Sequence, residues 1–349
     1  MNKTLQHFKP IWISLIEILC LFVLGGVIMH VIKSKSEESK EYLYFFSVSP
    51  NTRVRFSHGN LQFNVALGEH LCADGTIQPG SWRFAEHQWD FVGDAEKGTV
   101  YYNGEKCNNA KLSNKYDGWI DLFGWGTSGY NQKYPYMTKT NTNKYGDGAR
   151  DIAGTYYDWG VYNQIGSDTI GIWRTLTNDE WAYLFHEREN AQLLFGMGCV
   201  NEVNGVIILP DNWECPKNIE FTPSTEKGLT WGKNFHKYEC EENEYYYNGN
   251  ADNYSHNKYT IEEWDKLEKN GAIFLPTTGY RHYYNHVEID YIGSHGCYYA
   301  STQKCKQDEY GIDNLVYNLT FYDKWLIPQE QNYSRSNGYS VRLVKEISE

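Results

Sequence analysis

Three histidines and a glutamate lie close together in the second half of the chain, at His282, His286, Glu288 and His295. Imidazole nitrogens and a carboxylate are ligands that zinc accepts. On a helix His282 and His286 would share a face, but the three residues between them do not favour a helix. On a strand the two histidines would stand about 13 Å apart. We therefore expect exposed loop histidines here and no bound metal.

Other motifs that would carry catalysis or cation binding are incomplete. His186 and Glu187 lack a second histidine one turn later, where Asn190 stands, so they do not form a zinc-protease helix. The chain contains no nucleophile elbow with its partners and no phosphate-binding glycine loop. The Asn-Asp-Glu run at 178–180 offers oxygen atoms to calcium, but a role in starting a helix explains it better. These motifs predict no catalytic residue, no metal and no cofactor.

All of the eight cysteines except Cys20 follow an apolar segment near the N-terminus. Disulfides persist outside the cytoplasm, so an exported chain can oxidise such residues. Spacing favours three pairs and leaves Cys240 over. The candidate pairs are Cys72 with Cys107, Cys199 with Cys215, and Cys297 with Cys305. Spacing does not fix connectivity, so these pairs are hypotheses.

The segment from residue 283 to 333 mixes tyrosine with asparagine, histidine, aspartate and serine, without a regular period. Large rigid rings among small polar residues are typical of antibody binding surfaces, and ring faces also suit sugars. An ordinary wet loop surface is the alternative interpretation. The residues that we predict to contact a ligand are Tyr283, Tyr284, Tyr298, Tyr299, Tyr310, Tyr322, Trp325, Tyr333 and Arg335.

Two short helices and the strands after them must position these residues. Thr177 with Glu180, and Thr260 with Glu263, are capping boxes, each followed at once by a tryptophan. Apolar runs at 206–209 and 272–275, each stopped by a proline, predict two buried strands. The alternating segment at 339–344 predicts a half-buried final strand. We therefore expect two amphipathic helices that pack on one sheet, each held there by its tryptophan.

The composition indicates one folded domain after the N-terminal region. The chain has 349 residues, 41% hydrophobic, with 30 Tyr, 12 Trp and 31 Gly. Aromatic residues with glycine and asparagine favour short strands and long loops over helical bundles. The net charge is −12, and no basic stretch follows the first forty residues. Nucleic-acid binding needs a basic footprint, so the sequence argues against it.

The N-terminal region predicts a membrane anchor. Residues 11–32 are apolar except for Ser14, Glu17 and His30, and this length crosses a bilayer. Lys3 and Lys9 precede the segment and favour a cytoplasmic N-terminus, residues 1–10. Residues 33–41 form a charged linker, and residues 42–349 form a domain outside the cytoplasm, in the cell envelope. A cleaved signal peptide is the alternative, although no clear cleavage site follows.

Several ordered blocks resemble a known family. Residues 173–181, Trp-Arg-Thr-Leu-Thr-Asn-Asp-Glu-Trp, resemble a block of the formylglycine-generating-enzyme-like branch of the C-type-lectin fold, and 338–343 resemble its closing strand. The aromatic blocks at 82–89, 124–130 and 274–281 resemble a bacterial group of exported surface proteins close to the Fibrobacter succinogenes major paralogous domain. The resemblance covers roughly residues 45–344. It implies an α+β, C-type-lectin-like domain with two short helices, antiparallel sheets and long loops.

The resemblance brings no established activity with it, and two functions remain open. The first is a membrane-anchored binding or adhesion protein that presents a loop-rich face to a glycan or protein, between the second helix and the final strand. A similarity to variable ligand-binding proteins of diversity-generating retroelements points to the same face. The second is a formylglycine-generating-type oxidase, which needs a late cysteine pair able to hold copper(I). Cys297 and Cys305 form the only late pair, although their neighbours do not resemble that active-site segment.

Overall fold

The computed structural model describes residues 44–92, 114–136, 151–224, 230–233, 245–248, 254–281, 289–303, 315–322 and 325–347. Side chains are described in these segments except at 230–233, 245–248 and 331–334. The chain divides into two units, Met1–Tyr44 and Phe45–Glu349. The predicted anchor at 11–32 lies outside the described residues. Within the segments just given, no helix has the length and apolar character that a membrane span needs.

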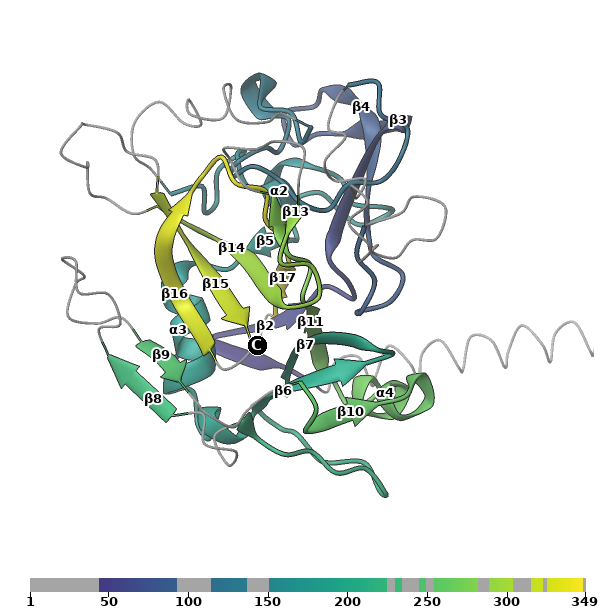
Figure 1. Cartoon of the computed structure of the whole chain (residues 1–349). Coiled ribbons are helices and arrows are strands. Elements are labelled where there is room, and N and C mark those ends of the chain that lie inside the picture. The colour runs from purple at the N-terminus through teal and green to yellow at the C-terminus, as the bar shows by residue number, and fades with distance from the viewer. Residues whose placement is uncertain are drawn as a thin grey trace, which may run out of the picture. The chain divides into compact units, whose positions relative to one another are not determined.

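Strands dominate the described part of the chain (Figure 1). The strands are β1 (Phe46–Ser49), β2 (Thr52–Phe56), β3 (Leu61–Leu71), β4 (Ile77–Phe84), β5 (Arg174–Thr175), β6 (Phe195–Val200), β7 (Val203–Ile208), β8 (Thr230–Lys233), β9 (Tyr245–Asn248), β10 (Asn257–Tyr259), β11 (Ile273–Pro276), β12 (Tyr280–Arg281), β13 (Ile289–Asp290), β14 (His295–Gln303), β15 (Leu315–Tyr322), β16 (Trp325–Ser334) and β17 (Leu343–Glu346). The helices are η2 (Tyr130–Gln132), α2 (Trp159–Tyr162), α3 (Asn178–Ala182), the π-helix η4 (Tyr183–Glu187), η5 (Ala191–Leu193) and α4 (Ile261–Glu268). The α+β class is confirmed.

The sheets join parts that are distant in sequence. Their strand orders are β1-β2-β17-β5, β10-β6-β7-β11, β14-β15-β16-β9-β8, and the pairs β12-β13 and β3-β4. The strand β17 pairs with β2 and β5, so the end of the domain closes against its beginning. The final strand expected at 339–344 is confirmed in part, because the ladder begins at Leu343. Among these sheets only β6 and β10 pair in parallel.

Both capping boxes are present. Thr177 accepts from the backbone N–H of Glu180 while the Glu180 carboxylate accepts from the N–H of Thr177. Thr260 and Glu263 make the same reciprocal pair at the start of α4. Gly271, with φ of 87°, adopts the left-handed conformation shortly after α4, in a turn whose N–H groups bond back to the helix end. The sequence therefore predicted both helix starts correctly.

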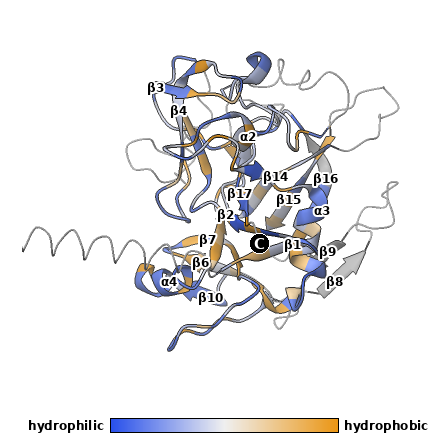
Figure 2. Ribbon diagram, turned by 180° about the vertical axis from the view of Figure 1, so that it is seen from behind, coloured by the Kyte–Doolittle hydropathy of each residue, from blue (hydrophilic) through white to orange (hydrophobic). Residues whose placement is uncertain are grey.

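The strands that follow the two helices pair with each other. In the antiparallel ladder of β7 and β11, Ile273 lies opposite Ile208, and Leu275 lies opposite Val206. Figure 2 shows hydrophobic colour along β6 and β7 and mixed colour along α4, as expected for strands buried on both faces and a helix buried on one. The two similar sequence patterns thus meet at one sheet, as the sequence predicted, with Trp181 in the same core cluster as Ile208 and Trp264 in the same cluster as Ile207.

Three clusters of buried hydrophobic residues form the core. One surrounds Trp181, a second surrounds Trp159, and a third surrounds Trp264. The strand β14 separates the first two, because Tyr298 belongs to the Trp181 cluster while its neighbour Tyr299 belongs to the Trp159 cluster. Successive side chains of a strand point to opposite faces, so β14 is buried on both sides.

The structure describes both members of only one predicted cysteine pair. Cys72, Cys199, Cys215 and Cys297 are all free thiols. The predicted pair Cys199–Cys215 is therefore not formed: Cys199 is buried in β6, while Cys215 lies in an exposed loop with its Sγ 3.2 Å from the carbonyl oxygen of Ile219. Cys107 and Cys305, the predicted partners of Cys72 and Cys297, lie outside the described residues.

His186 in η4 gives a prediction for the pH dependence of stability. Burial lowers the pKa of His186 from 6.5 to about 3, so the folded protein holds the imidazole neutral. Between those two pH values the unfolded chain binds one more proton, and stability falls as the pH falls. We expect this residue to remove about 2 kcal/mol of the free energy of unfolding between pH 7 and pH 5.

The measurement is urea unfolding at pH 7 and pH 5 for the native chain and for His186→Gln. The variant should lose less stability than the native chain over this interval, since glutamine does not titrate. Equal losses in the two proteins would show that His186 is accessible to protons in the folded state.

Candidate functional site

The structure divides the predicted ligand-binding residues into three groups. Tyr283, Tyr284, Tyr310 and the side chain of Tyr333 lie outside the described part of the chain. Tyr298, Tyr299 and Arg335 are buried, with exposed fractions of 0%, 1% and 3%. Tyr322 and Trp325 are half-buried.

The prediction was wrong for Tyr298 and Tyr299, because β14 lies between two clusters of the core. The hydroxyl of Tyr298 donates to the carbonyl oxygen of Pro276 at 2.9 Å and accepts from the side-chain amide of Asn60. The hydroxyl of Tyr299 donates to the carbonyl oxygen of Asn337 at 2.7 Å. Both hydroxyls are satisfied internally, as buried tyrosines require. These residues hold the fold together and do not face a ligand.

Arg335 is also a structural residue. Its guanidinium carbon lies 5.8 Å from the centre of the Trp125 ring, a cation–π distance. Its backbone carbonyl accepts from the N–H of Trp125 at 3.0 Å. The prediction that Arg335 contacts a ligand was therefore wrong as well, since its side chain is not available at the surface.

Tyr322 and Trp325 belong to a line of rings that we call the aromatic row: Tyr291, His295, Tyr322 and Trp325. In the sheet His295 lies directly opposite Tyr322, and Tyr322 lies directly opposite Trp325. Residues directly opposite each other point to the same face, so three neighbouring strands place these rings side by side. The turn after β13 adds Tyr291.

The rings of the aromatic row contact one another. The centre of the His295 ring lies 4.3 Å from that of Tyr291 and 4.5 Å from that of Tyr322, the second pair being nearly parallel at 5°. The ring centres of Tyr322 and Trp325 are 6.5 Å apart. Tyr291 is 54% exposed. The row therefore presents rigid ring surface, partly open to solvent, at one end of the sheet.

The row has little charge chemistry of its own. The pKa of Tyr322 is raised by burial, with smaller contributions from Glu330 and Cys297, so its hydroxyl stays neutral. Nδ1 of His295 lies 3.0 Å from the hydroxyl of Ser294. Apolar contact and hydrogen bonds from hydroxyl and imidazole groups are what this arrangement can offer to a ligand.

The described residues give no support for a metal-binding site or a reactive cysteine. The described residues contain no group of three or more His, Cys, Asp or Glu placed to hold a metal ion. His282, His286 and Glu288 lie outside them. Cys297 is fully buried and accepts from the hydroxyl of Thr320 at 3.8 Å, and burial raises the pKa of its thiol to about 12. Copper(I) and nucleophilic chemistry both require the thiolate, which this environment disfavours.

Cys297 is therefore expected to be unreactive toward iodoacetamide at pH 8 in the folded protein and reactive in urea. Cys215, which is exposed, should be alkylated in the folded protein and provides the control. Peptide mapping by mass spectrometry distinguishes the two sites. Rapid alkylation of Cys297 in the folded protein would contradict the buried position.

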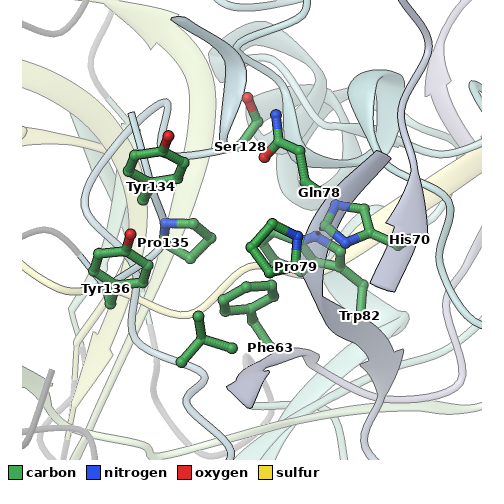
Figure 3. Close-up of a pocket in the computed structure, with 10 residues that line it drawn as sticks. Phe63, His70, Gln78, Pro79, Trp82, Ser128, Tyr134, Pro135 and Tyr136 are labelled. Atoms are coloured by element: carbon green, nitrogen blue, oxygen red, sulfur yellow. Dashed lines mark hydrogen bonds between the residues drawn. The ribbon is translucent and has the colours of Figure 1, made fainter. Parts of the chain in front are cut away.

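A second ring-lined feature was missed by the sequence analysis. The loop containing Tyr134, Pro135 and Tyr136 packs across from Pro79 of β4 and leaves a small hollow of about 10 Å³, room for about one water molecule (Figure 3). No role was predicted for this loop from the sequence. The tyrosine–proline–tyrosine run at 134–136 was the available signal, because tyrosine-rich loops are typical of binding surfaces.

Comparisons with known proteins found no relative of this chain. No family model, no curated protein and no solved structure matches the chain. Function must therefore be argued from the residues and their geometry.

Proposed function

We propose that the chain is a membrane-anchored binding or adhesion protein whose C-type-lectin-like domain lies outside the cytoplasm. Its ligand is a glycan or a protein, held in part by the aromatic row. The observation that carries this proposal is the row itself: four ring side chains, contributed by β14, β15, β16 and the turn after β13, lie in contact and partly exposed.

The geometry of the row favours binding over a purely structural role. Tyrosine and tryptophan dominate the binding energy of interfaces because they bury much area and have few rotatable bonds. Rings already stacked on one another lose little side-chain freedom when a ligand arrives. Single exposed rings are common on protein surfaces. The aromatic row is a contiguous group of rings on three paired strands, and contiguous exposed apolar surface is more typical of a binding site.

The finer fold assignment rests on the motif resemblance together with local geometry. The two capped helices, the pairing of the final strand with β2, and the loop-rich segments between them agree with that assignment. The membrane anchor and the position outside the cytoplasm rest on the apolar segment at residues 11–32. The oxidase alternative receives no support from the buried, protonated thiol of Cys297.

The test is a glycan and protein array screened with residues 41–349, which contain all of the described core, followed by variants of the row. Trp325→Ala and Tyr291→Ala should each weaken binding by about 1–4 kcal/mol. The melting temperature should change little, because both side chains are partly exposed. Tyr156→Ala, a tyrosine 38% exposed in a different ring cluster, is the matched control and should bind as the native domain does.

Affinity losses that follow losses in melting temperature would contradict a direct role for the row. Equal losses for Tyr156→Ala would place the ligand elsewhere on the domain. Protease access tests the location: a domain that stays protected after the outer membrane is permeabilised, and is cleaved only after the cytoplasmic membrane is broken, would contradict it.

A further inference from the structure

We propose that Arg83, whose guanidinium stacks on Trp119, binds the carboxylate of an Asp or Glu side chain on a protein partner. This inference goes beyond the proposed function, because it assigns a second contact surface and one chemical class of partner. Neither residue belongs to the aromatic row, so the two surfaces can be tested separately.

Strand pairing positions Arg83 beside a fixed acceptor. Gln62 of β3 lies directly opposite Arg83 of β4, so both side chains point to the same face of the hairpin (Figure 1). The Nε–H of Arg83 donates to the side-chain oxygen of Gln62 at 2.8 Å. Gln62 is 4% exposed, so the surrounding core holds its amide in place. The inner end of the guanidinium is therefore anchored to the hairpin.

Trp119 holds the guanidinium from a second direction. The central carbon of the guanidinium lies 3.7 Å from the centre of the Trp119 ring, a close cation–π contact. The next residue, Ile120, exchanges backbone hydrogen bonds with Phe63, both at 2.9 Å. The side-chain amide of Asn64 donates to the carbonyl oxygen of Asp117 at 2.9 Å. These bonds attach the segment that carries Trp119 to β3, so the arginine is held in place before any partner arrives.

The terminal nitrogens of Arg83 remain available. The side chain is exposed, and neither Nη1 nor Nη2 has a hydrogen-bond or ion-pair partner in the part of the chain that the structure describes. Arg53 is the other exposed arginine among the described residues. It lies over the ring of Phe45 at a longer distance of 4.6 Å, and no described group accepts a hydrogen bond from its guanidinium. Of these two arginines, only Arg83 is both stacked and held through Nε.

The free edge of this guanidinium fits a carboxylate. Its terminal N–H groups form a planar fork that matches the two oxygens of a carboxylate, and such charge-assisted pairs are about twice as strong as neutral hydrogen bonds. A side chain that is already held in place loses little rotational freedom on binding. Arginine and tryptophan are also among the residues that most often dominate the binding energy of protein interfaces.

The charge of the chain argues against a polyanion as the partner. The net charge is −12. Desolvation lowers the pKa of Arg83, and the nearby carboxylates of Glu86 and Asp90 act in the opposite direction. An anionic polysaccharide or a nucleic acid would meet these negative charges along its length. A single carboxylate on an otherwise neutral or basic partner would meet few of them, and is the better match.

An exposed apolar side chain favours a protein over an acidic sugar. Ser81 lies two residues before Arg83, on the same face of β4, and its hydroxyl donates to the carbonyl oxygen of Leu67. Leu67 is 51% exposed. Apolar area near a stacked arginine and tryptophan can be covered by the side chains of a protein partner, as in the core of an interface. The hydroxyls of a sugar acid would lose their hydration there without new partners.

The test uses random peptides displayed on phage and selected on the full chain in detergent. A second selection on Arg83→Gln removes the peptides that bind without this arginine. The peptides that remain should share one Asp or Glu, and the strongest binder is synthesised for affinity measurements. Changing its acidic residue to the amide should weaken binding about tenfold, and Arg83→Gln should do the same. Both changes together should weaken binding little more than either alone, because they remove the same ion pair.

Charge reversal and two matched controls complete the experiment. Arg83→Glu should bind a peptide whose acidic residue is replaced by arginine, which a merely structural role of Arg83 would not produce. Arg53→Gln should bind the original peptide as the native chain does. Trp325→Ala, in the aromatic row, should also leave peptide binding unchanged, which separates this surface from the proposed function. The melting temperature of Arg83→Gln should change little, because the side chain is exposed.

Four results would overturn the assignment. They are no peptide that depends on Arg83, Arg83-dependent peptides that lack an acidic residue, an equal loss of binding for Arg53→Gln, and affinity losses that follow losses in melting temperature. An oligogalacturonate fragment is the second probe. Binding of this acidic sugar through Arg83, with no peptide selected, would assign the surface to a polysaccharide and overturn the protein partner.

Discussion

Replacing Trp181 with alanine is expected to lower the free energy of unfolding by about 3–5 kcal/mol. The side chain is 0% exposed, and its ring centre lies 6.0 Å from that of Phe56 and 6.4 Å from that of Phe185. Its cluster includes residues of three sheets. The space left by the indole is bounded by strands that cannot close around it, so a cavity term adds to the lost burial.

Trp264 provides an independent second case. It is also 0% exposed and packs against Phe274 with ring centres 5.6 Å apart. Ile261 lies on the same helix but is 43% exposed, so Ile261→Ala is the matched control and should cost less than about 0.5 kcal/mol. Chemical denaturation measures all three variants. A native-like stability for Trp181→Ala or Trp264→Ala would show that these helices do not pack on the sheets as described.

The features that the sequence predicted correctly are local ones. A capping box is complete within four residues, so Thr177 and Glu180 identify a helix start without knowledge of the rest of the fold. The apolar strands before Pro210 and Pro276 are indicated in the same way. The C-terminal strand was indicated in part by its alternation, although its ladder begins only at Leu343.

The features that the sequence did not predict depend on distant partners. The burial of β14 on both faces was not predicted, because tyrosines in a polar segment are typical of a surface. In the structure Tyr298 and Tyr299 each face a different cluster of the core. Their hydroxyls find acceptors at Pro276 and Asn337, which no local pattern reveals. Tyr322 and Trp325 became part of a site only through strand register.

The second large effect is expected at Arg342, which directly precedes β17. Its side chain is buried, with 1% exposure. The guanidinium donates to the side chains of Asn60 at 3.3 Å and Gln88 at 2.7 Å, and to the carbonyl oxygen of Phe274 at 3.2 Å. Burial lowers its pKa to about 10, so the group remains charged at pH 7.

These contacts join four parts of the domain. Asn60 begins the turn into β3 and also contacts the hydroxyl of Tyr298, and Gln88 links Phe274 of β11 to Glu268 at the end of α4. One guanidinium can satisfy these acceptors together because its donors form a planar fork. Removing it leaves buried acceptors without their partner, which costs more than the lost bonds contribute.

Arg342→Met is therefore expected to lower the free energy of unfolding by about 2–4 kcal/mol, because buried neutral acceptors lose a charged donor, although the variant keeps much of the apolar stem. Arg342→Lys keeps the charge but cannot reach all three acceptors, so its loss should be smaller but still above about 1 kcal/mol. Arg53→Met, at an exposed position of β2, is the control and should change stability by less than about 0.5 kcal/mol. Urea unfolding at pH 7 measures the three variants. If Arg342→Met were as stable as the native protein, the hydrogen bonds from Arg342 to Asn60, Gln88 and Phe274 would not contribute to stability. The position of β17 would then depend on its pairing with β2 and β5 alone.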